Sequence, residues 1–164
     1  MTTTVILADY QNPKHQQDIP IMMQAYATDP MGGGTPIAES VLAGLVEKLA
    51  QLPYAFSVLA YQGDDVVGLA NCFEGFSTFQ AKPLINIHDL VVANGHRGQG
   101  VGQALLQAVE NIAQEKGCCK ITLEVLSNNE IAQGAYQKFG FAGYQLSETG
   151  GQALFWQKSL ATES

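Results

Sequence analysis

The chain has 164 residues and a formal net charge of −7, from 8 basic and 15 acidic residues. This length is typical of one domain, so we expect residues 1–164 to form a single domain. The acidic balance disfavours nucleic acid and anionic membranes as partners, because both require a concentrated basic surface. We find no apolar run of the ~18 residues that span a membrane and no signal peptide, and therefore expect a cytoplasmic protein.

The cysteines and histidines show no spacing that is typical of a metal site or of a redox dithiol. Cys118 and Cys119 are adjacent, and Cys72 lies in an apolar segment. We therefore predict reduced cysteines and no bound metal.

The first half of the chain favours antiparallel strands with two helices near the start. Asp29 and Pro30 end the first helix, and Thr35 followed by Pro36 is typical of the start of a second. Gly63 marks a hairpin turn. The predicted elements are a strand at 4–8, helices at 18–28 and 36–49, and strands at 55–61, 66–76 and 84–92.

The second half alternates helix and strand. Apolar residues recur at helical spacing before Gly117, and Gly140 follows a shorter helix that Asn128 or Asn129 can cap. The order strand, helix, strand is a crossover, which predicts two parallel strands inside an otherwise antiparallel sheet. Phe155 and Trp156 should pack in the core through a last strand. The predicted elements are helices at 100–116 and 129–138, and strands at 120–126 and 152–160.

The most informative segment is the glycine-rich loop between the strand at 84–92 and the helix that follows it. Glycines at 98, 100 and 102 allow backbone N–H groups and a helix N-terminus to approach one anion. A phosphate-binding P-loop requires a lysine after the glycines, and none is present. A dinucleotide fingerprint requires a third glycine where Gln103 stands. A simple tight turn between strand and helix also remains open.

Two motifs resemble the GNAT superfamily of N-acetyltransferases. The segment from Arg97 to Gly102 is similar to its Arg/Gln-x-x-Gly-x-Gly/Ala signature, and the segment from Asn129 to Phe141 is similar to its Asn-x-x-Ala-x-x-x-Tyr-x-x-x-Gly-Phe motif. The resemblance implies an α/β (α+β) fold with about four helices. It also implies a mixed, mostly antiparallel seven-stranded sheet, splayed between its fourth and fifth strands to admit the cofactor.

The resemblance implies acetyl-CoA as the co-substrate, with its pyrophosphate on the loop amides. Backbone groups of Leu90 and Val92 would pair with the pantetheine arm as a peptide strand would. Asn129 could contact the same arm or cap its own helix. The implied cofactor residues are Leu90, Val91, Val92, Arg97, Gly98, Gln99, Gly100, Val101, Gly102, Gln103, Asn129 and Tyr136.

Three residues are candidates for catalysis. An alkyl ammonium with a pKa of about 10.4 must lose a proton before it can attack a thioester, and His88 or Asp89 could accept that proton. Their side chains should point to opposite faces of the strand unless a bulge intervenes. By resemblance, Tyr136 is the general acid that protonates the departing thiolate.

The segment from Ile87 to Val92 is similar to the diamine and polyamine (thialysine-like) branch of that superfamily, with His88 where the branch has a glutamate. We therefore expect an enzyme that acetylates a primary amine of a small molecule: a polyamine, a diamine or an amino-acid-like compound. The alternatives are a non-catalytic acyl-CoA-binding domain and a dinucleotide-binding module. A homodimer is compatible with each.

Overall fold

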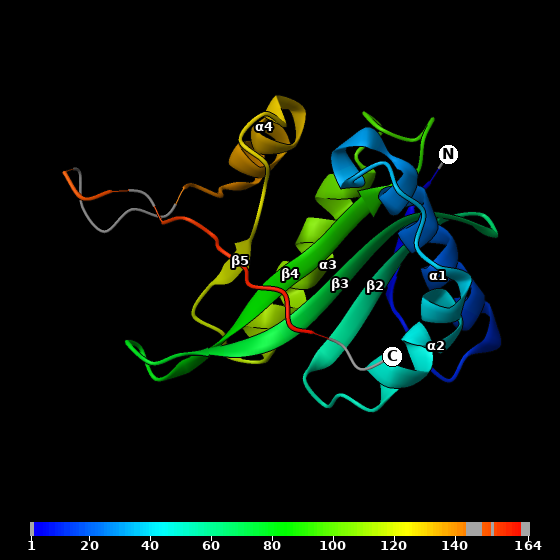
Figure 1. Ribbon diagram of the computed structural model, residues 1–164, viewed down its shortest axis with the longest axis horizontal. Coiled ribbons are helices and arrows are strands. Elements are labelled where there is room, and N and C mark those ends of the chain that lie inside the picture. The colour runs from blue at the N-terminus through cyan, green and yellow to red at the C-terminus, as the bar shows by residue number, and fades with distance from the viewer. Residues whose placement is uncertain (1, 144–148, 152, 162–164) are drawn as a thin grey trace.

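A computed structural model of the chain describes residues 2–143, 149–151 and 153–161. Within these residues, five strands form one sheet in the order β1-β2-β3-β4-β5 (Figure 1). Strands β1 to β4 are antiparallel to their neighbours, and β4 pairs with β5 in parallel. The mixed, mostly antiparallel sheet is therefore confirmed, with five described strands instead of the expected seven. They are β1 (Thr4–Leu7), β2 (Ala55–Gln62), β3 (Asp65–Ser77), β4 (Lys82–Val92) and β5 (Ile121–Leu123).

Helices cover both faces of this sheet. The long amphipathic helix α3 lies on one face, where its buried residues Val101, Leu105 and Val109 pack against the sheet residues Ala70 and Ile85. On the other face, α1 and α2 enclose a second core with the opposite side chains of β2, β3 and β4. The helices are α1 (Pro13–Thr28), α2 (Glu39–Ala50), α3 (Val101–Glu115) and α4 (Glu130–Phe139), with a short 3-10 helix η1 (Pro30–Gly32) after α1.

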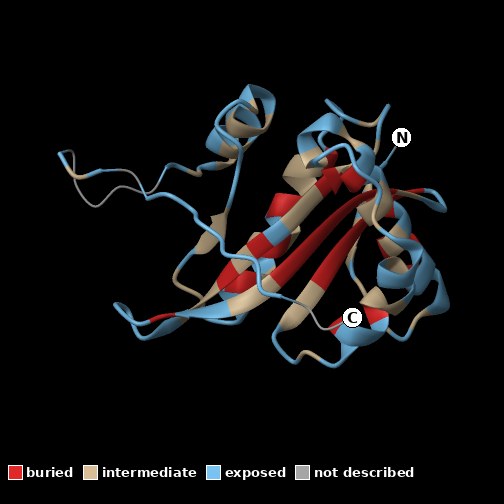
Figure 2. Ribbon diagram, in the orientation of Figure 1, coloured by how far each residue is buried: buried red, intermediate tan, exposed pale blue. Residues whose placement is uncertain are grey.

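Burial is concentrated in the sheet and in the side of α3 that faces it (Figure 2). The crossover from β4 through α3 to β5 brings two distant segments together in parallel, as predicted. Gly117, with a φ of +71°, ends this crossover helix in the left-handed region that favours glycine. No helix in the described residues is long and apolar enough to cross a membrane.

Helix α1 starts five residues before its predicted start at residue 18. The side chain of Asn12 caps it by accepting a hydrogen bond from the Lys14 amide at 2.9 Å. Pro13 follows at the first helical position, where the missing N–H costs nothing. The Asn-Pro pair is therefore the start signal, and the turn before Asp18 belongs to the helix.

Helix α2 starts three residues after its predicted start at residue 36. The side-chain amide of Gln24 accepts a hydrogen bond from the Ile37 amide at 2.8 Å and donates one to the Ile37 carbonyl at 3.1 Å. Because both backbone groups of Ile37 are bound by a residue of α1, the segment stays extended and the helix begins at Glu39. A long-range contact here overrides the local signal of Thr35 and Pro36.

The predicted last strand is wrong for the part of it that the structure describes. Residues 153–160 contain no strand, and residue 152 lies outside the described residues. Phe155 is 74% exposed and Trp156 is 84% exposed, so neither packs in the core as expected. An apolar run becomes a strand only when a neighbouring strand binds its backbone groups, and in the structure this segment runs as exposed chain (Figure 2).

Candidate active site

The sheet opens where β4 and β5 diverge. Their pairing runs from Ile85 opposite Ile121 to Ile87 opposite Leu123 and ends there, and the chain after β5 leads away toward α4 (Figure 1). The Ala93 amide donates to a β3 carbonyl, so strand alternation turns the backbone groups of Leu90 and Val92 away from β3. These groups therefore face the opened side of β4.

The glycine-rich loop follows directly and forms the N-terminus of α3. Gly98 has a φ of +79° and Gly100 a φ of +85°, and a Cβ added at either would meet no atom within 4 Å. Gly100 is the N-cap residue of α3 and supplies no side-chain cap. The amide groups in the first turn of α3 therefore have no side-chain acceptor, and the space beside the loop glycines is open. Both features fit an anionic ligand.

Polar contacts fix the loop from two directions. Arg97 forms an ion pair with Asp29, which follows α1, with 2.7 Å between Nη2 and Oδ2. This contact, together with the Met31 amide, lowers the pKa of the Asp29 carboxyl. Gln99 accepts a hydrogen bond from the Gln62 side chain at 3.1 Å. The loop is therefore tied to α1 and to the end of β2.

Helix α4 stands across the opening from this loop. Gln103 in the first turn of α3 donates to the Ala135 carbonyl at 3.0 Å and so links the two helices. Asn129 caps α4 by accepting a hydrogen bond from the Ala132 amide at 3.1 Å. The sequence left two uses open for Asn129, and the structure assigns its carboxamide oxygen to the cap.

Tyr136 lies on α4 and is half-buried. Its ring meets the Phe141 ring edge-on, with 5.9 Å between the centroids. Burial raises the pKa of the Tyr136 phenol, and the nearby Tyr26 phenol of α1 raises it further. Burial also raises the pKa of Tyr26, with a further contribution from the carboxylates of Asp89 and Asp29. Residues from α4, α1 and β4 therefore share one electrostatic environment.

A bulge in β4 brings His88 and Asp89 to one face of the sheet. Asp89 lies opposite Asn71 and Ile87 lies opposite Cys72, so His88 is the extra residue of the bulge. The His88 ring contacts the Phe73 ring edge-on at 5.6 Å. In a regular strand the side chains of His88 and Asp89 would point to opposite faces, but the extra residue of the bulge turns both to the same face. Both side chains lie on the face that carries α1.

A polar row that sequence reasoning missed supports Asp89 from within the sheet. Ser57, Asn71 and Asp89 are direct neighbours on β2, β3 and β4. Ser57 donates to Asn71 Oδ1 at 2.7 Å, and Asn71 Nδ2 donates to Asp89 Oδ2 at 3.0 Å. Tyr10 adds a hydrogen bond of 2.8 Å to the Ser57 hydroxyl. The sequence feature that could have indicated this row is Asn71, a single asparagine within an apolar stretch of β3.

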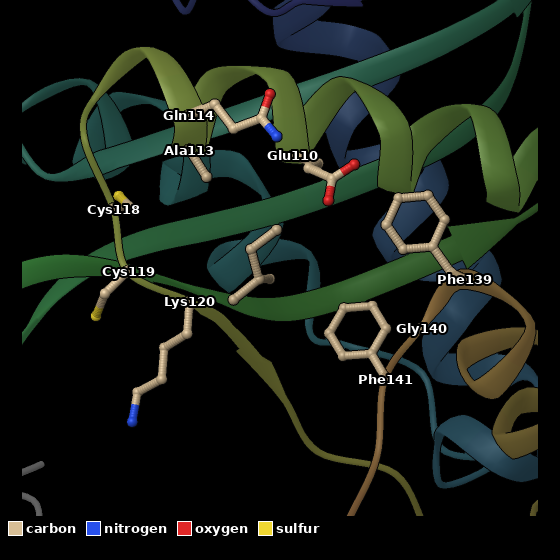
Figure 3. A pocket seen from close by; sticks show the side chains of 10 residues that line it. Glu110, Ala113, Gln114, Cys118, Cys119, Lys120, Phe139, Gly140 and Phe141 are labelled. Atoms are coloured by element: carbon tan, nitrogen blue, oxygen red, sulfur yellow. The ribbon is translucent and has the colours of Figure 1, made fainter.

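Some predicted residues lie apart from the opening. The Val91 side chain is buried in the core beneath α1 and α2. A pocket of about 320 Å³ lies at the C-terminal end of α3, where the stacked rings of Phe139 and Phe141 and the Glu110 carboxylate border it (Figure 3). No residue predicted for catalysis or cofactor binding lines this pocket. Within the described residues, no group of His, Cys, Asp and Glu could hold a metal ion.

Several known proteins are similar to this chain in sequence. Thialysine N-epsilon-acetyltransferase of Bos taurus is 34% identical over 79 residues, which are 48% of this chain and 46% of that protein. Streptothricin acetyltransferase of Streptomyces lavendulae is 41% identical over 58 residues, 35% of this chain and 31% of that protein. The chain thus spans less than half the length of these two relatives. The mouse thialysine N-epsilon-acetyltransferase is 27% identical over 149 residues, 91% of this chain and 79% of that protein.

Solved structures establish the fold. An aminoglycoside acetyltransferase from an uncultured soil metagenomic sample, in complex with trehalose, superposes with a TM-score of 0.77 at 16% identity and covers 97% of both chains. AAC(6')-Iy in complex with the bisubstrate analog CoA-S-monomethyl-acetylneamine superposes with a TM-score of 0.74 at 18% identity, covering 98% of this chain and 100% of that one. The model of the acetyltransferase (GNAT) family matches residues 22–141, and the chain therefore belongs to this family.

Proposed function

We propose that the chain is an acetyl-CoA-dependent N-acetyltransferase that acetylates a primary amine of a small molecule. One observation carries the proposal. The half of β4 that is not paired with β5 leads at one end into the N-terminus of α3, which has no side-chain cap. At its other end it carries the Asp89 carboxylate and the His88 imidazole. An anionic donor and a cationic acceptor can therefore meet along one strand. Family membership supports the same chemistry.

The residues present fit the cofactor. Acetyl-CoA would supply an activated thioester and an anionic pyrophosphate. The loop from Gly98 to Gly102 offers backbone amides in an open cradle, and Arg97 offers a cationic side chain beside it. The backbone groups of Leu90 and Val92 face the opened side of β4, where they can bind an extended chain as another strand would. Gln103, through its contact with α4, would keep the two walls of the site together.

The side chains of the site suit proton transfer in both directions. An alkyl ammonium with a pKa of about 10.4 must lose a proton to become nucleophilic, and His88 or Asp89 would accept it. Tyr136 would donate its phenolic proton to the departing thiolate sulfur. Because burial raises the Tyr136 pKa, this phenol keeps its proton throughout the neutral range. Tyr136 would therefore still carry its proton when the thiolate departs and could donate it.

The acceptor class follows from charge and from the relatives. The Asp89 carboxylate lies near Tyr26 at the acceptor side and has no ion-pair partner among the described residues, an arrangement that attracts a cation. The relatives are named for thialysine and streptothricin. His88 replaces the glutamate that the sequence resemblance leads one to expect there. We therefore propose a small primary amine rather than a specific polyamine.

Release of free coenzyme A from acetyl-CoA, measured across polyamines, diamines, amino acids and aminoglycosides, tests this function. We expect turnover with at least one small primary amine. Coenzyme A binding without turnover for any amine would contradict the proposal and favour a non-catalytic acyl-CoA-binding domain. The His88→Ala variant should change the pH dependence of kcat/KM if His88 is the base; an unchanged profile assigns that role to Asp89.

A further inference from the structure

The polar row across β2, β3 and β4 has a fixed hydrogen-bond direction. The Ser57 hydroxyl donates its single proton to Asn71 Oδ1, so Tyr10 must donate to the Ser57 oxygen. Asn71 then donates from Nδ2 to Asp89 Oδ2. Every donor in the row therefore points toward the Asp89 carboxyl, and the last of them holds one carboxyl oxygen in place.

Asn71 is the central member of the row and has no freedom to turn. It is 4% exposed, and Ser57 beside it is fully buried. Its Nδ2 also touches the Met23 sulfur at 3.2 Å, so α1 closes the site from above. A reversed carboxamide would place its oxygen against the Asp89 carboxylate, which is electrostatically unfavourable.

Asp89 is bound on one side only. Its Oδ2 atom accepts the Asn71 hydrogen bond, while no hydrogen bond within the described residues reaches its Oδ1 atom. The Asp89 side chain is half-buried rather than enclosed. One carboxylate oxygen is thus held by the sheet, and the other is available on the face that carries His88.

We propose that Asn71 is a positioning residue that fixes the Asp89 carboxylate and directs its Oδ1 atom at the ammonium group of the acceptor. This inference rests on the proposed function and adds the group that orients the acceptor. Asp89 is the contact residue, and the row behind it sets its direction. Ser57 and Tyr10 act one step further away, by orienting Asn71.

Ionisable groups from several elements surround Asp89. The Asp89 carboxylate raises the pKa of the Tyr26 phenol and of the buried Cys72 thiol, and both groups stay protonated at neutral pH. Burial likewise raises the pKa of Tyr10. The other titratable groups around this site are Asp29, His88 and Tyr136.

The first test replaces Asn71 with leucine, which has a similar volume but no hydrogen-bonding groups. In Asn71→Leu we expect the KM for the acceptor amine to rise about tenfold, while the KM for acetyl-CoA stays within about twofold. An unchanged acceptor KM, or an equal rise in the KM for acetyl-CoA, would overturn the proposal.

A matched control comes from the same strand. Asn86 donates to the Thr122 hydroxyl at 2.9 Å between β4 and β5, within the paired half of β4. Asn86→Leu removes an equivalent cross-strand hydrogen bond, so it should lower the melting temperature without changing the acceptor KM. If Asn86→Leu raises the acceptor KM as much as Asn71→Leu does, general loosening of the sheet explains the rise and the positioning role is wrong.

A reciprocal exchange separates positioning from folding. In the double variant Asn71→Asp, Asp89→Asn, residue 71 can accept from Ser57 and from the new amide at 89, so every hydrogen bond of the row is retained. Because position 71 is buried, the carboxylate introduced there should lower the melting temperature. We expect the folded double variant to keep a KM for acetyl-CoA within about twofold of wild type, while kcat/KM for the acceptor falls roughly 10²-fold because the carboxylate has moved to β3. Retention of wild-type kcat/KM would overturn the proposal.

A binding readout also keeps this inference distinct from the proposed function. If wild-type protein turns over no amine, the proposed function fails, and calorimetric binding of diamines and polyamines to wild type and to Asn71→Leu still decides whether Asn71 directs Asp89 at an ammonium group; equal affinities would overturn the inference.

Discussion

The two halves of β4 serve opposite purposes. The paired half ends at residue 87, has β3 on one side and β5 opposite residues 85–87 on the other, and contributes the fully buried Ile85 to the core beneath α3. The open half, residues 88–92, has only β3 beside it among the described residues and leads into the glycine-rich loop. Stability and ligand binding are therefore carried by adjacent segments of one strand, and substitutions in the two halves should have separable effects.

The paired half should dominate stability. Ile85→Ala removes a fully buried side chain from the core under α3 and should lower the free energy of unfolding by about 2–5 kcal/mol, measured by urea denaturation. Ile131→Ala is the control, because Ile131 is 89% exposed and its loss should change stability little. The KM for acetyl-CoA of the folded Ile85→Ala protein should match wild type; a large increase would show that the halves are coupled.

Catalysis should depend on the residue that faces the open half from α4. Tyr136→Phe keeps the ring contact with Phe141, and within the described residues no hydrogen bond to the Tyr136 hydroxyl is lost. We expect kcat to fall about 10²-fold with coenzyme A affinity nearly unchanged. Because the Tyr136 pKa is raised, wild-type kcat should not decline on the alkaline side below about pH 10. An unchanged kcat in Tyr136→Phe would remove the acid role.

Local signals in the sequence identify much of this site. Glycines at 100 and 140 lie where the chain turns left-handed at a helix end, and Asn129 caps the helix that it precedes. These features depend on residues within a few positions of one another. The strand before the loop, the helix after it and the parallel crossover follow from the same kind of short-range pattern, which is why they were predicted correctly.

Apart from the start of α1 at Asn12 and Pro13, the features that were missed depend on distant residues. The bulge at His88 exists only relative to β3, and the polar row through Asn71 requires the register of three strands. Gln24 delays the start of α2 by binding Ile37 thirteen positions away. The apolar residues near Trp156 are typical of a strand, but a strand also needs a partner. Register and tertiary hydrogen bonds cannot be derived from local propensity.

Two glycine-to-alanine substitutions, one in the glycine-rich loop and one at the other end of α3, should separate coenzyme A binding from stability. Gly100→Ala forces an alanine to a φ of +85°, which costs about 1–2 kcal/mol and disturbs the amides at the start of α3. We expect coenzyme A binding to weaken about tenfold, measured by calorimetry. Gly117→Ala imposes a similar strain at a φ of +71° at the other end of α3, and should lower stability without affecting coenzyme A binding. Equal binding losses in both variants would contradict a specific role for the loop.

The smallest expected effect concerns the ion pair that anchors the loop after the open half to α1. Because Arg97 lowers the Asp29 pKa, the pair stabilises the fold above the ordinary carboxyl pKa of about 3.9, and this contribution disappears as the pH falls through the lowered value. The Arg97 side chain is 58% exposed, so solvent limits the contribution to less than about 1 kcal/mol. Asp29→Asn should therefore reduce the free energy of unfolding slightly at pH 6, with the difference from wild type vanishing near pH 2. Asparagine can also cap η1, so a difference that persists at pH 2 would mean that Asp29 contributes by something other than its cap and its charge on Arg97.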